Sequence, residues 1–169
     1  MLVELLRVNT DILGLDEATG RLRADHDILL AHVEAQPDIA LIAGPLGDFC
    51  ESLHDLVAHV LMWDEINLAV LAEARAGRAH WSLDARWETS DAGRWLNRGG
   101  VLAGRELPSD LLLHRLVTAR DAFLAELEGY DEDVWRSGRG ALAQRVCTVP
   151  GEPAYWHAAL HLNAVPAGR

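Results

Sequence analysis

The chain has 169 residues, of which 50% are hydrophobic and 24% are charged, and this composition excludes a disordered protein. Its formal net charge is −11, and all 15 of its basic side chains are arginine. An acidic chain without a basic run attracts neither phosphate backbones nor anionic lipids, so we expect no nucleic-acid or membrane partner. We predict a single domain over residues 1–169 with a core of its own.

Three features of the sequence predict a cytoplasmic protein: its cysteines, its first residues and its most apolar stretch. Cys50 and Cys147 lack metal or redox spacing, and we expect them to be reduced thiols. Glu4 lies early in the chain and no small-residue cleavage site follows, so we expect no signal peptide. Residues 53–71 are very apolar but carry several charged and histidine side chains, which predicts a buried helix rather than a membrane span.

The first half of the chain predicts two long helices. Residues 1–15 are ambiguous between a short helix and an arm that packs on a partner. A helix is expected from residues 16–19 to Gln36, because apolar side chains recur there at helical spacing and Pro37 follows. Residues 37–51 then form a connection rich in turn-forming residues.

The second helix is expected from Ser52 to Ala76. Ser52 can cap it together with Asp55, in a capping box that has aspartate in place of glutamate, and Gly77 is expected to stop it. Because its sequence is apolar nearly all round, we place it at the centre of the fold.

Residues 78–107 are less regular and contain Trp81, Trp87 and Trp95. A helical piece is expected over residues 91–96, and the pair Gly99-Gly100 is expected to break it. A long aromatic connection in a compact domain is often functional, but its tryptophans can equally well just cover the bundle.

A third long helix is expected from Ser109 to Glu128, with Arg120 among the charged residues of its exposed face. Residues 130–150 are expected to form a loop, and a short last helix is expected between Pro153 and Pro166. The sequence therefore predicts an all-α four-helix bundle with a loop-rich connection between helices 2 and 3.

Three histidines are candidate metal ligands. His157 and His161 are four residues apart, which places both imidazoles on one face of a helix. His59 lies far upstream in a very apolar context. Bundles build metal sites from side chains on facing helices, and three protein ligands with an open fourth position are typical of catalytic metals. Imidazole ligands favour Zn²⁺, although Ni²⁺ and Fe²⁺ also accept them.

Around these residues the sequence resembles the DinB/YfiT-like superfamily. The resemblance rests on the Ser52–Glu65 stretch, with its serine cap, aspartate, "AH" pair and "WDE" run, and on the closing H-x-x-x-H at 157–161. It implies a four-helix bundle, often dimeric, with His59, His157 and His161 as metal ligands. The superfamily includes metal-dependent thiol S-transferases, relatives that isomerise maleylpyruvate with mycothiol, and resistance hydrolases that open strained rings.

Further residues are candidates for catalysis and binding. Asp64 and Glu65 could act as a catalytic base or as a carboxylate partner of a ligating histidine. Arg86 and Arg94, with Arg98, are candidate contacts for a low-molecular-weight thiol. We expect this thiol to be mycothiol, because the arginine-rich composition without lysine indicates a GC-rich, actinobacterium-like genome. The other histidines are expected elsewhere: His26 in the core, His32 and His114 on solvated faces, and His54 away from His59.

Three functions stay open from the sequence. The first is a divalent-metal-dependent transferase or isomerase that activates a thiol. The second is a metal-independent hydrolase or binding protein for a hydrophobic natural product, with residues 80–96 lining its pocket. The third is a non-enzymatic dimeric stress protein. The first two imply a small-molecule substrate, and all are compatible with a homodimer.

Overall fold

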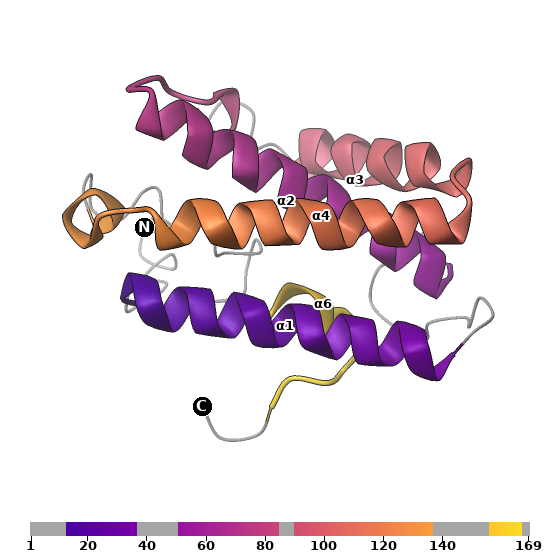
Figure 1. The fold of residues 1–169 in the computed structure, drawn as a ribbon. Helices are drawn as coiled ribbons and strands as arrows, with labels where there is room; N and C mark the ends of the chain where they lie inside the picture. Colours follow the sequence, from indigo (N-terminus) through magenta and orange to yellow (C-terminus); the bar gives the residue numbers. More distant parts are fainter. Residues whose placement is uncertain (1–12, 37–50, 85–89, 137–155, 167–169) are drawn as a thin grey trace, which may run out of the picture.

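The computed structural model describes residues 13–36, 51–84, 90–136 and 156–166, and over these residues the protein is all-helical. The elements are α1 (Leu15–Ala35), α2 (Leu53–Arg75), the 3-10 turn η2 (Trp81–Leu83), α3 (Ser90–Arg105), α4 (Ser109–Glu128) and α6 (His157–His161). In Figure 1, α1 runs in the opposite direction to α2 and α4, and the short α6 lies behind α1. Among these elements, no helix combines the length and apolarity needed to cross a membrane.

The predicted signals at both ends of α2 are confirmed. Ser52 Oγ accepts a hydrogen bond from the Asp55 amide at 3.1 Å, and Asp55 Oδ2 accepts one from the Glu51 amide at 2.8 Å. At the other end Gly77 has φ +70°, and the Arg78 amide donates to the Glu73 carbonyl at 2.9 Å. This is a Schellman ending, which needs a residue that tolerates positive φ.

The expected break at Gly99-Gly100 is wrong, because α3 continues through both glycines to Arg105. The reason is close packing against α2. A Cβ at Gly100 would lie 2.4 Å from Met62 Sδ, and a Cβ at Gly104 would lie 2.2 Å from Ala58 Cβ. These glycines allow two helices to approach closely.

Two further boundaries differ from the expectation. Residues 132–136 are helical where a loop was expected, because Asp131 Oδ1 accepts hydrogen bonds from the Asp133 and Val134 amides and Trp135 is buried. The last helix ends at His161, before the expected stop at Pro166. The expectations for residues 1–12, 37–50, 85–89, 137–155 and 167–169 lie outside the described residues.

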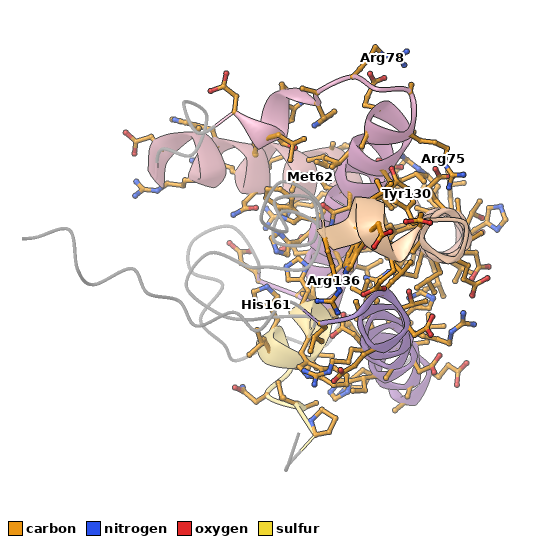
Figure 2. All side chains as sticks on the ribbon, turned by 90° about the vertical axis from the view of Figure 1, so that its left-hand side faces the viewer. Met62, Arg75, Arg78, Tyr130, Arg136 and His161 are labelled. Atoms are coloured by element: carbon orange, nitrogen blue, oxygen red, sulfur yellow. The ribbon has the colours of Figure 1, made fainter. Side chains whose placement is uncertain are left out.

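The core consists of two apolar clusters along α2. One joins α1, α2 and α4 around Phe123 and Trp135, and the other joins the opposite end of these helices to Ala158 of α6. At the edge of the first cluster, Arg75 lies over the Tyr130 ring, 5.0 Å from its centroid (Figure 2). The second cluster draws α6 against both α1 and α2, and this contact positions the candidate site.

Candidate metal centre

The structure brings together the three histidines that the sequence singled out. His59 lies on α2, and His157 and His161 are the first and last residues of α6. One possible ligand atom from each lies within 4.8 Å of those of the other two. The ring centroids of His59 are 4.8 Å from those of His157 and 5.2 Å from those of His161. Figure 2 shows His161 on α6, away from the Arg75–Tyr130 end of the molecule.

Burial keeps the three imidazoles neutral. His59 is 3% exposed, and desolvation, with a smaller effect of the His161 charge, lowers its pKa to about 3. Desolvation lowers the pKa of His161 to about 4 and also lowers that of His157 well below its usual value. His157 and His161 keep partial exposure. At neutral pH all three side chains are therefore in the form that binds metal ions.

The donor set fits a divalent metal. His59 Nε2 and His157 Nε2 face each other at 2.9 Å. Two unprotonated nitrogens repel each other at this distance. Either one ring therefore donates an N–H hydrogen bond to the other, or a cation binds the lone pairs of both nitrogens. Two nitrogens bound to one tetrahedral Zn²⁺ at 2.0–2.1 Å lie about 3.3 Å apart, so the His59–His157 pair needs to move by only a few tenths of an ångström. The ligand atoms of the whole set lie within 4.8 Å of one another, so the widest separation among them must shrink by up to about 1.5 Å when a metal binds.

The two candidate catalytic carboxylates are not part of this cluster. Asp64 is buried, and its Oδ2 accepts a hydrogen bond from Arg120 Nε at 2.7 Å. Desolvation raises the pKa of Asp64 to about 6, although Arg120 opposes the shift. Glu65 is largely exposed and pairs with Arg115 of α4 at 2.5 Å. Asp64 therefore pairs with Arg120 of α4 in the interior, and Glu65 pairs with Arg115 on the surface.

The candidate thiol contacts that the structure describes, Arg94 and Arg98, are exposed on α3. Arg98 lies 5.9 Å from the Trp95 ring centroid. Arg86, together with Trp87, lies outside the described residues. Trp81 and Trp95 are 47% and 67% exposed, so neither of these two lies in an enclosed pocket.

The remaining histidines follow the sequence expectations in part. His26 is buried and His114 is exposed, as expected, whereas His32 is partly buried. His54 points away from the cluster, since its Nε2 lies 3.1 Å from the Leu107 carbonyl.

Two residues near the site were missed by sequence reasoning. Arg120 was expected on an exposed face but is 1% exposed, and Asp25 of α1 is 0% exposed. Arg120 was detectable, because it continues the apolar stripe of Leu112 and Leu116 at four-residue spacing. The burial of Asp25 was detectable in the same way, because it lies three residues after Leu22 and four before Leu29 on the apolar face of α1, but its partners lie more than 90 residues away.

Comparison of the chain with family models, with curated proteins and with solved structures finds no match. The resemblance to the DinB/YfiT-like superfamily therefore stays a prediction from the residues around His59 and His157.

Proposed function

We propose that this protein binds one divalent metal ion through His59, His157 and His161 and is a metal-dependent small-molecule enzyme, a transferase or a hydrolase. The observation that carries the proposal is the convergence of three neutral imidazoles from α2 and α6 within 4.8 Å. Three nitrogen ligands leave at least one coordination position for a substrate or water. We also propose that the helices form a bundle of the DinB type.

The chemistry follows from an open, histidine-bound metal. When bound, such an ion lowers the pKa of a coordinated thiol or water, so that a nucleophile exists at neutral pH. His59 supplies a rigid ligand from a central helix, whereas His157 and His161 approach from a separate short helix. A low-molecular-weight thiol such as mycothiol is the proposed cosubstrate, with S-transfer or isomerisation as the reaction. The resemblance further suggests a cytoplasmic homodimer.

The test is metal content and thiol turnover on protein purified without chelator. We expect about one zinc, nickel or iron per chain by elemental mass spectrometry, and thiol consumption with an electrophile panel that stops on chelation and returns with Zn²⁺. His161→Ala should lose both metal and turnover, whereas the exposed control His114→Ala should keep both.

Three results would overturn this proposal. If the wild-type protein neither contains a metal nor binds one when it is added, the proposed metal-dependent activity is ruled out. Turnover of a strained-ring compound that survives alanine at all three histidines would instead indicate a metal-independent hydrolase. Absence of turnover, together with an unchanged phenotype in that triple variant, would favour a non-enzymatic protein.

A further inference from the structure

The helix that carries two of the three proposed ligands is too short to hold itself in place. α6 has five residues, and its N-cap, Trp156, makes no side-chain capping hydrogen bond. Isolated helices of this length are not stable in water, because nucleation is unfavourable. The directions of the His157 and His161 imidazoles must therefore be set by contacts from outside α6.

A buried carboxylate from α1 supplies the missing cap. Asp25 Oδ2 accepts a hydrogen bond from the Ala158 amide at 3.1 Å, and Asp25 Oδ1 accepts one from the Ala159 amide at 2.9 Å. These are the second and third residues of α6, whose amides have no partner inside the helix. A carboxylate at this end also interacts favourably with the helix dipole.

The same carboxylate is connected to the helix that carries the third ligand. Arg120 Nη1 lies 3.9 Å from Asp25 Oδ2 and donates to the Leu22 carbonyl at 2.9 Å. Arg120 Nε donates to Asp64 Oδ2 at 2.7 Å, and Asp64 lies on α2, five residues after His59. A continuous buried chain of polar contacts thus runs from α6 through α1 and α4 to α2.

We infer that Asp25 is a positioning residue of the metal centre, which holds His157 and His161 at ligating distance from His59. The inference rests on the proposed metal site. A helix cap alone needs only a local serine or aspartate at the N-cap position, without the cost of burying a distant charge. The Asp25 carboxylate does more, because it ties α6 to the network that also holds α2.

The chain offers a matched control for Asp25. Glu132 Oε2 accepts a hydrogen bond from the Leu15 amide at 2.8 Å and thereby caps α1 from a distant segment. Glu132 is exposed and belongs to no ligand-bearing helix. Asp25→Asn and Glu132→Gln each remove the charge of a carboxylate that caps a helix distant in the sequence. Asp25 caps α6, whereas Glu132 caps α1, so only Asp25→Asn affects the helix that carries the ligands.

The experiment measures Zn²⁺ affinity by competition with a chelating dye, and the visible spectrum of the Co²⁺ form, in full-length protein. We expect Asp25→Asn to weaken Zn²⁺ binding about 10- to 100-fold and to alter the Co²⁺ bands, and Glu132→Gln to change affinity less than about twofold. An unchanged affinity and spectrum in folded Asp25→Asn would overturn the inference.

Asp25→Glu covers the case in which Asp25→Asn does not fold. It keeps the charge and both acceptor oxygens but lengthens the side chain, so it should displace α6 and weaken Zn²⁺ binding several-fold. Wild-type affinity in this variant would also overturn the positioning role.

A metal-free measurement separates this inference from the proposed function. If wild-type protein binds neither Zn²⁺ nor Co²⁺, the proposed function fails, and the positioning role is read from the nuclear Overhauser effect between the His59 and His157 rings. Loss of this effect in Asp25→Asn, with its retention in Glu132→Gln, supports the role. Its persistence in Asp25→Asn contradicts it.

Discussion

His59 Nε2 lies 2.9 Å from His157 Nε2, although 98 residues separate the two histidines along the chain. One imidazole comes from the second turn of a long buried helix, and the other begins a five-residue helix. Because neither helix can bind a metal with three imidazoles alone, any metal bound here must also stabilise the fold.

Zinc binding should therefore raise the melting temperature. At a free Zn²⁺ concentration 100 times the dissociation constant, linkage predicts a gain of about 2.7 kcal/mol, or about 5–10 °C for a chain of this size. His59→Ala should abolish the shift in differential scanning fluorimetry, and His114→Ala should retain it. An equal shift in both variants would show that zinc binds elsewhere.

The glycines of α3 should respond in opposite directions to alanine. Gly104→Ala places a methyl group 2.2 Å from Ala58 Cβ, where backbone must move, and should cost about 1–3 kcal/mol. Gly99→Ala meets nothing within 4 Å and should stabilise the helix by about 0.5–1 kcal/mol. Urea unfolding measures both, and equal effects would argue against the α2–α3 contact.

Removal of Arg120 should destabilise the protein far more than removal of a surface arginine. Arg120→Met leaves Asp25 and Asp64 buried without their shared cation, which should cost about 3–5 kcal/mol. Arg115→Met breaks only the exposed pair with Glu65 and should cost less than about 1 kcal/mol. Chemical denaturation compares them, and similar losses would mean that Arg120 is not buried in solution.

His26 should make stability fall as the pH falls. Burial, reinforced by the Arg120 charge and opposed by Asp121 and Asp27, lowers its pKa from 6.5 to about 4. Between these values the unfolded chain takes up a proton that the native state does not. His26 therefore contributes a loss of up to about 1.4 kcal/mol of unfolding free energy per pH unit as the pH drops from 6.5 toward 4.

His26→Leu isolates this contribution. Leucine also removes a buried Nδ1 that has no hydrogen-bond partner among the described residues. The variant should show a flatter dependence of unfolding free energy on pH, and the exposed His114→Leu should match wild type. Asp64 acts in the opposite sense, since its raised pKa makes the native state bind the extra proton between about pH 4 and 6. A slope unchanged in His26→Leu would contradict the burial of His26.

Local signals predicted the long helices because their causes are local. Ser52 and Gly77 mark the two ends of α2 through hydrogen bonds to residues only a few positions away. Residue type alone indicates such capping. The prediction that Gly99-Gly100 breaks a helix was wrong because its cause is not local. A glycine pair is a helix breaker when its surroundings are empty, but at Gly100 the contact with Met62 of another helix determines the outcome.

The sequence by itself determined the all-helical class, the limits of α1 and α2, and the candidacy of His59, His157 and His161, because periodicity, caps and residue chemistry act over one or two turns. Only the tertiary structure decided that these histidines converge, that Asp64 pairs with Arg120, and that Asp25 caps α6. Those relationships join residues 56 to 134 positions apart. They depend on how apolar faces pack, and no short window of sequence contains both partners.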